Sequence, residues 1–109
     1  MCISKTQTMS KMKNDEIAEL IQRRRLQVLI HSCIYYEFNE LIVSDAKWSE
    51  WALELEQLQA KYPKIAKKVI YAKEFENFDH STGCDLPTRN PEVTRKARWL
   101  IDYVRRTKL

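Results

Sequence analysis

The stretch LIHSCIYYEFNELIVSDAKWSEWALELEQLQAKYP, residues 29–63, decides the fold. It joins an aromatic-rich apolar segment to an amphipathic one through a short apolar connector, residues 40–43. Ser44 and Asp45 are good N-cap candidates for the second segment. Its apolar residues recur at steps of three and four, the spacing of one helix face: Trp48, Trp51, Ala52, Leu55 and Leu58. The stretch therefore predicts two helices, one ending near Asn39 and one spanning about 46–61.

The flanking sequence predicts where the first helix begins and adds two further helices. Asn14 or Asp15 can cap the start of the first helix, and acidic residues in its first turn suit the helix dipole. Apolar spacing over residues 65–78 predicts a helix after Pro63. Asn90-Pro91 predicts the start of a last helix over residues 91–107, with a capping side chain followed by proline at the first helical position.

These segments predict an all-α fold, a single-domain bundle of about four helices built on an antiparallel helical hairpin over residues 27–65. Residues 1–13 read as a flexible polar tail, and residues 14–109 as one helical domain. Residues 79–89 form the long loop, a length that is often functional.

Composition limits the function classes. The chain has 109 residues, 44% of them hydrophobic and 31% charged, as in a soluble protein with one modest core. No apolar run approaches the roughly 20 residues of a membrane span, and the N-terminus has no secretory signal pattern. The three cysteines, Cys2, Cys33 and Cys84, are odd in number and widely spaced, which favours a reducing cytoplasm. Cys33 is expected to be a small buried hydrophobe.

Glycine is nearly absent. Gly83 is the one glycine in the chain, and phosphate-cradling loops need several because the backbone must approach the phosphates closely. This excludes a Walker loop and a G-x-G-x-x-G fold. The net charge of +4 permits an anionic partner without requiring one.

Residues 27–65 resemble the N-terminal domain of NAD-dependent DNA ligases, a helical hairpin that grips the nicotinamide mononucleotide half of NAD. The stretch aligns without a gap and covers about a third of the chain. The matches are carried by a family ligand tyrosine, the Ser-Asp-Ala step, the Leu- and Glu-rich helix and its proline stop: Tyr35, Ser44, Asp45, Ala46, Leu53–Leu58 and Pro63.

The departures from the family pattern fall mainly at ligand positions. Tyr36 stands where the family often has His, Trp48 replaces a Tyr, and Ser49 replaces an Asp. In the loop, Asn39 and Leu41 replace Asp and Pro. Trp48 keeps an aromatic face but loses a phenolic hydroxyl, and Ser49 loses a charge.

The resemblance implies a cofactor site for NAD or nicotinamide mononucleotide at Tyr35, Tyr36, Asp45, Trp48 and Ser49. A cationic nicotinamide ring favours aromatic faces, and Asp45 can accept hydrogen bonds from a ribose or an amide. The run Arg23-Arg24-Arg25 is a candidate for the phosphate. The alternative is that the aromatic side chains are core and Asp45 only caps the second helix.

The catalytic part of such a ligase has no counterpart in this sequence. There is no K-x-D-G motif for adenylation, so we expect a non-enzymatic module. One alternative is that it binds a nicotinamide nucleotide. The other is that it is a small regulator or inhibitor, phage-encoded by its size, that acts through protein or nucleic-acid contacts. A split-ligase subunit is a third reading.

Two other groups of residues carry possible chemistry. His80 and Cys84 lie four apart, but a structural zinc site needs four ligands, so no metal is expected. The last helix carries basic residues beside aromatic ones, which suits a nucleic-acid or protein partner or simply a solvated face: Arg95, Arg98, Trp99, Arg105 and Arg106.

Overall fold

The computed structural model describes residues 13–80 and 86–107. In these residues the fold is all-α, as predicted, and the helices are α2 (Asn14–Phe38), α3 (Asp45–Lys61), α4 (Pro63–Ala66) and α5 (Pro91–Thr107). None of these helices combines the length and the apolar character that a membrane span requires. Of the predicted tail, only Lys13 lies within the described residues.

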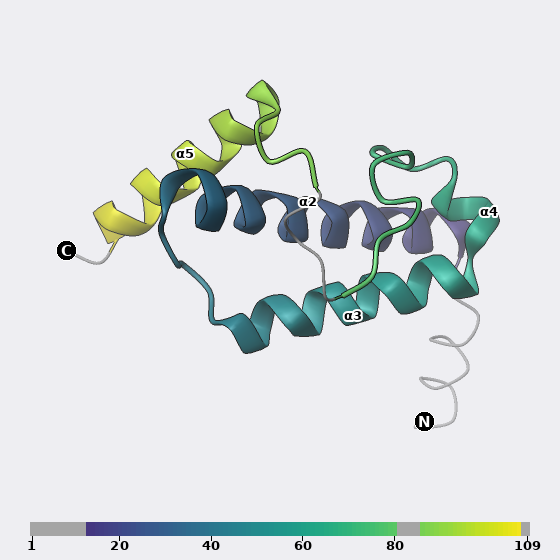
Figure 1. The fold of residues 1–109 in the computed structure, drawn as a ribbon. Helices are drawn as coiled ribbons and strands as arrows, with labels where there is room; N and C mark the ends of the chain where they lie inside the picture. Colours follow the sequence, from purple (N-terminus) through teal and green to yellow (C-terminus); the bar gives the residue numbers. More distant parts are fainter. Residues whose placement is uncertain (1–12, 81–85, 108–109) are drawn as a thin grey trace.

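Helix α2 is the centre of the structure, and the other three helices pack around it. α3 lies alongside α2 and runs in the opposite direction, whereas α5 crosses α2 near its C-terminal end (Figure 1). Helices α3 and α5 do not contact each other. The core is therefore built on two sides of α2, with its fully buried members contributed by several segments: Ile21, Val28, Leu29, Cys33, Ala52, Leu55, Phe75, Val93 and Ala97.

Local capping signals determine the helix ends. Asn39 adopts a left-handed conformation, φ 55°, and terminates α2. The Ser44 side chain accepts a hydrogen bond from the Lys47 backbone N–H at 3.1 Å, so Ser44 is the cap of α3 and Asp45 is its first residue. The Asn90 side chain accepts from the Glu92 N–H at 2.9 Å and starts α5. At α2 the prediction of an Asn14 or Asp15 cap is wrong, because the N-cap residue is Lys13.

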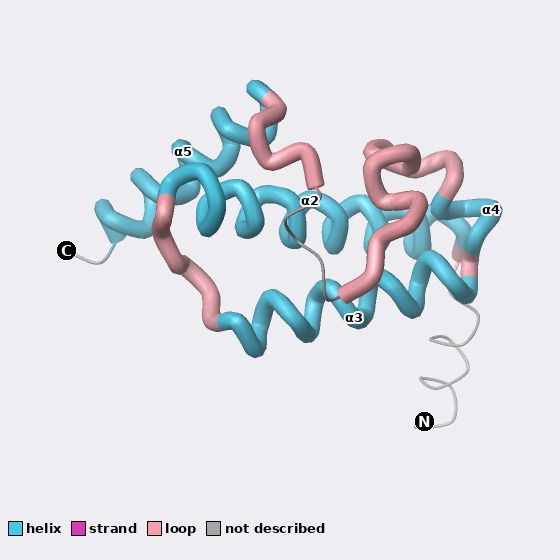
Figure 2. The backbone as a smooth tube through the Cα atoms, in the orientation of Figure 1, coloured by secondary structure: helices cyan, strands magenta, loops and turns pink. Residues whose placement is uncertain are grey.

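The prediction of a helix over residues 65–78 is wrong. Helix α4 ends at Ala66, and residues 67–77 form bends and turns (Figure 2). Tyr71 has a φ of 64°, which a continuing helix cannot contain. Apolar spacing misled the prediction because Val69 and Phe75 do reach the core, but from turns rather than from one helix face.

The cause of this change is Arg25 of α2, which is 1% exposed. Its guanidinium donates to the carbonyl oxygens of Ala66 at 3.0 Å, Val69 at 3.0 Å and Ile70 at 2.9 Å. In a helix those oxygens would accept from backbone N–H groups four residues on. The arginine thus takes over the acceptors that a longer helix would use.

Arg25 also connects this segment to α3 and to an aromatic ring. Its Nε donates to Gln59 Oε1 at 2.9 Å, and Gln59 Nε2 donates to the Phe75 carbonyl at 3.1 Å. The guanidinium carbon lies 5.7 Å from the centroid of the Phe75 ring. Burial lowers the pKa of Arg25 to about 10, an effect that Glu74 partly opposes. The group therefore stays charged at neutral pH.

We expect Arg25→Met to destabilise the fold by about 3–5 kcal/mol, because it removes the charged donor to the Ala66, Val69 and Ile70 carbonyls and to Gln59, the first two of these carbonyl contacts being buried. Urea unfolding measures the change. Arg23→Met is the matched control, because Arg23 is exposed and its ion-pair partner among residues 13–80 and 86–107 is Glu19 on its own helix, and it should change stability by less than about 1 kcal/mol. Equal stability of the two variants would contradict the role given to Arg25.

Candidate functional site

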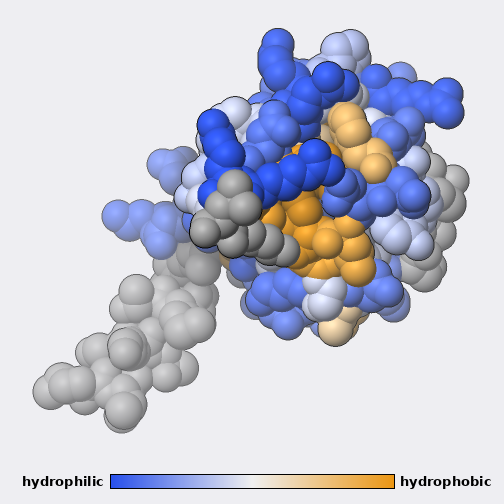
Figure 3. All heavy atoms as spheres, turned by 90° about the vertical axis from the view of Figure 1, so that its left-hand side faces the viewer, coloured by the Kyte–Doolittle hydropathy of each residue, from blue (hydrophilic) through white to orange (hydrophobic). Residues whose placement is uncertain are grey.

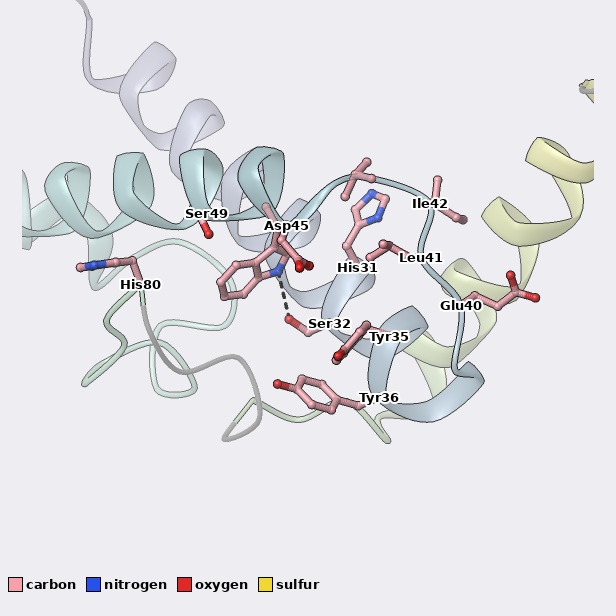
Figure 4. A pocket seen from close by; sticks show the side chains of 12 residues that line it. His31, Ser32, Tyr35, Tyr36, Glu40, Leu41, Ile42, Asp45, Ser49 and His80 are labelled. Atoms are coloured by element: carbon pink, nitrogen blue, oxygen red, sulfur yellow. Dashed lines mark hydrogen bonds between the residues drawn. The ribbon is translucent and has the colours of Figure 1, made fainter.

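A pocket lies where α2 ends and α3 begins, and it has a volume of about 360 Å³. Its lining residues come from the last turns of α2, the connector, the first turn of α3, and one loop residue. They are His31, Ser32, Tyr35, Tyr36, Glu40, Leu41, Ile42, Val43, Asp45, Trp48, Ser49 and His80 (Figure 4). All five residues predicted to bind the cofactor are among them.

Two tyrosines form the α2 side of the pocket. Tyr35 and Tyr36 are 51% and 50% exposed, and their rings meet edge to face with centroids 5.0 Å apart. The two tyrosines directly follow the buried residues Cys33 and Ile34 of α2, but neither ring belongs to the core. The alternative in which both tyrosines are simply core residues is therefore wrong, and their faces are accessible to a ligand.

Trp48 has a different role from the tyrosines. It is partly buried, and its indole Nε1 donates to the Val28 carbonyl at 3.3 Å and to Ser32 Oγ at 3.2 Å. These bonds join α3 to α2 beside the pocket, and the one that Ser32 accepts is the dashed line in Figure 4. Because its N–H is already used, Trp48 can offer a ligand ring contact but no hydrogen bond.

The pocket carries negative rather than positive charge. Its lining residues in the described part of the chain include Asp45 and Glu40 but no Lys or Arg. Glu40 forms an ion pair with Arg105 of α5, and its carboxylate points away from the other labelled side chains (Figure 4). Asp45 is exposed and has no ion-pair partner among the described residues. Asp45 is therefore the carboxylate that remains available to a ligand.

The predicted phosphate contacts from Arg23, Arg24 and Arg25 are not formed by this arrangement. Arg23 pairs with Glu19, Arg24 pairs with Glu54 at 2.9 Å, and Arg25 is buried. Arg25, the nearest of the three in sequence, lies ten residues before Tyr35. This separation corresponds to about 15 Å along the helix axis. Arg24 and Arg25 join α2 to α3 instead, whereas Arg23 pairs within α2.

His31 and His80 are lining residues that the sequence analysis did not propose. His31 precedes Tyr35 by one helical turn, a spacing that could have indicated a shared face, and its ring lies 5.3 Å from that of Trp51. His80 comes from the loop after the turns and is held by Glu56 of α3 at 2.9 Å. No local sequence signal connects His80 to the pocket.

Burial lowers the pKa of His31, and its Nδ1 has no hydrogen-bond partner among the described residues. The imidazole is therefore neutral at physiological pH. A neutral imidazole adds no positive charge to the pocket and leaves Asp45 as its dominant charge.

The end of the molecule where α2 turns into α3 has both apolar and charged character. In the view from the end of the molecule where α2 turns into α3, an apolar area lies between hydrophilic side chains (Figure 3). The connector residue Leu41 is 60% exposed.

The basic residues predicted on α5 are divided by the structure. Arg98 stacks over the Phe38 ring at 5.5 Å, and Arg105 pairs with Glu40, so both face α2. Arg95, Trp99 and Arg106 lie on the other side of the helix. Within the described residues no group of three or more His, Cys, Asp or Glu side chains is placed to hold a metal ion, and Cys84 lies outside them.

Comparisons of this chain with protein-family models, with curated proteins and with solved structures found no match. The resemblance to the ligase domain therefore stays a prediction from the residues quoted above, of which Tyr35 and Asp45 line the pocket.

We expect the neutral state of His31 to make stability depend on pH. Because the folded pKa lies below the unfolded value of 6.5, the unfolded chain binds more protons between the two values, and stability falls as pH drops through that window. Unfolding in urea at neutral and mildly acidic pH should show a smaller loss for His31→Gln than for the wild type. An identical loss in both proteins would show that His31 does not carry this dependence.

Proposed function

We propose that the pocket between α2 and α3 binds the nicotinamide riboside portion of a nicotinamide nucleotide, and that the chain is a binding module rather than a catalyst. The observation that carries the proposal is the convergence of Tyr35, Tyr36, Asp45, Trp48 and Ser49 on one cavity. They come from the end of α2 and the start of α3, which the short connector between the two helices brings together.

The chemistry of the pocket favours a cationic aromatic ring. Exposed faces of Tyr35 and Tyr36 attract a positive ring, by about 1–2 kcal/mol when water is excluded. Asp45 supplies a carboxylate without a competing cation from the protein. The oxidised nicotinamide ring carries the positive charge that this arrangement complements, whereas the reduced ring is neutral.

The size and charge of the pocket also limit how much of the nucleotide enters. A volume of about 360 Å³ lies at the lower end of the range for small-molecule sites, about 300–1,000 Å³. It suits a nucleoside better than a whole dinucleotide. Since no Lys or Arg lines the described part of the pocket, the phosphate is expected to remain in solvent and to add little affinity.

The direct test compares ligands by titration calorimetry. Nicotinamide mononucleotide and NAD⁺ should bind, and NADH should bind at least about tenfold more weakly, because a loss of about 1.4 kcal/mol corresponds to a factor of ten. Nicotinamide riboside should bind about as well as the mononucleotide. The proposal fails if millimolar nicotinamide mononucleotide gives neither heat nor a rise in melting temperature, or if NADH binds equally well.

Substitutions of single residues test whether the ligand binds in this pocket. Asp45→Asn removes the free carboxylate, and Tyr35→Ala removes a ring face, so each should weaken nicotinamide mononucleotide by about tenfold. Asp15→Asn is the matched control, because Asp15 is an exposed carboxylate in the first turn of α2, at the opposite end of that helix. Its affinity should equal that of the wild type. Equal loss in all three variants would point to a general effect on folding.

A further inference from the structure

Helix α5 exposes two aromatic side chains that its packing does not explain. Trp99 is 59% exposed and Tyr103 is 47% exposed. The helix buries Val93, Ala97 and Ile101, and each exposed ring is two residues from a member of that set. With about 3.6 residues per turn, two residues correspond to about 200° around the axis. The rings therefore lie on the side opposite to the core.

The two rings are stacked on each other, so each ring covers part of one face of its neighbour. Their planes are inclined by only 10°, and their centroids are 5.3 Å apart. Trp and Tyr usually bury much of their ring area in a core or an interface. Parallel rings with this much exposed area provide faces on which another planar group can stack.

Two arginines flank the rings on the same side of the helix. Arg95 precedes Trp99 by four residues, and Arg106 follows Tyr103 by three, so the four side chains lie along one line. Neither guanidinium has an ion-pair or hydrogen-bond partner among the described residues. The other basic side chains of α5 are engaged, with Lys96 paired to Glu92, Arg105 to Glu40, and Arg98 over Phe38.

The charge of the whole chain is concentrated on this helix. Residues 91–107 contain five basic and two acidic residues, a net charge of +3, against +4 for all 109 residues. An anionic partner is therefore attracted to α5 rather than to the molecule as a whole. The pocket between α2 and α3, in contrast, is lined by carboxylates without Lys or Arg.

We propose that Arg95, Trp99, Tyr103 and Arg106, the α5 stripe, bind single-stranded nucleic acid. Unpaired bases stack on the exposed rings, and the two free arginines contact the phosphates, the combination that single-strand binders use. The proposal is independent of the nicotinamide pocket, because the stripe shares no residue with it.

Other occupants fit the stripe less well. A base-paired duplex keeps its bases stacked on each other and offers no free base face to the rings. A helix that lies on a membrane needs a broad apolar face, and the broad apolar face of α5 is already buried against α2. An acidic peptide can pair with the arginines but gives no reason for two parallel exposed rings.

The test is fluorescence anisotropy of a labelled oligo(dT) of about 16 nucleotides, at the upper end of single-strand site sizes, with the full chain. Binding should be tighter than to a duplex of the same length and should weaken steeply between about 50 mM and 200 mM salt. Trp99→Ala and Tyr103→Ala should each weaken oligo(dT) binding by about tenfold. Arg95→Gln and Arg106→Gln should each reduce the slope of log K against log salt by about 0.7.

Matched controls separate the stripe from general effects. Arg23→Gln removes an exposed arginine of another helix, which pairs with Glu19, and it should leave oligo(dT) affinity and salt slope almost unchanged. Asp45→Asn changes the nicotinamide pocket and should also retain oligo(dT) binding. Circular dichroism should show wild-type helix content and melting temperature for the stripe variants, because their side chains are exposed.

Several results would overturn the proposal. They are the absence of oligo(dT) binding at low salt, tighter binding to the duplex, and wild-type affinity in both aromatic variants. Association with vesicles of anionic lipid that depends on Trp99, without oligo(dT) binding, would assign the stripe to a membrane surface instead. Retention of the chain by an immobilised acidic peptide, again without oligo(dT) binding, would assign the stripe to a protein partner.

Discussion

The buried guanidinium of Arg25 is the interaction on which the rest of the structure depends. Four hydrogen bonds, all between 2.9 and 3.0 Å, join α2 to Gln59 of α3 and to the carbonyls of Ala66, Val69 and Ile70. A charge buried in this way is costly unless every donor finds a geometrically suitable acceptor. The end of α4 and the turns after it provide three of those acceptors, the carbonyls of Ala66, Val69 and Ile70.

A second connection holds the other end of the same helix pair. The Trp48 indole bonds to Val28 and Ser32 of α2, while Arg25 acts about two turns earlier on that helix. Between these two points α2 and α3 are fixed against each other. Beyond Trp48 the chain must leave α2 and enter α3 through residues 40–43, and the pocket lies in the space this reversal leaves.

The structure separates two kinds of surface on a small chain. The pocket is aromatic and acidic, whereas the outer side of α5 is aromatic and basic. Glu40 lies between them, because it lines the pocket and pairs with Arg105 of α5. Because of this separation, the two proposed ligands, a cationic ring and an anionic strand, would not compete for the same charges.

Local signals made most helix boundaries predictable from the sequence. Ser44, Asn90 and Asn39 act through hydrogen bonds or conformations of neighbouring residues, which short-range patterns capture. The turns at residues 67–77 were not predictable in this way, because their shape is set by Arg25, more than 40 residues earlier in the chain. The same arginine was expected at a phosphate, since nothing in the run Arg23-Arg24-Arg25 distinguishes the buried member from the exposed ones.

The candidate site was predicted in part. Its aromatic and acidic residues followed from the resemblance over residues 27–65, and the structure brings them together. His31 could have been inferred from its four-residue spacing to Tyr35, whereas His80 reaches the pocket through a contact with Glu56 that no spacing reveals. The division of the α5 arginines also required the structure, because only packing against α2 shows which of them are already engaged.

The central claim is that a positively charged nicotinamide ring occupies the pocket between α2 and α3. Nuclear magnetic resonance of the ¹⁵N-labelled chain during a titration with nicotinamide mononucleotide tests it most directly. We expect the Trp48 indole N–H and the backbone amides of Tyr35, Asp45 and Ser49 to shift, while the indole N–H of Trp99 stays in place. Shifts confined to α5, or no shift at any of these positions, would contradict the account.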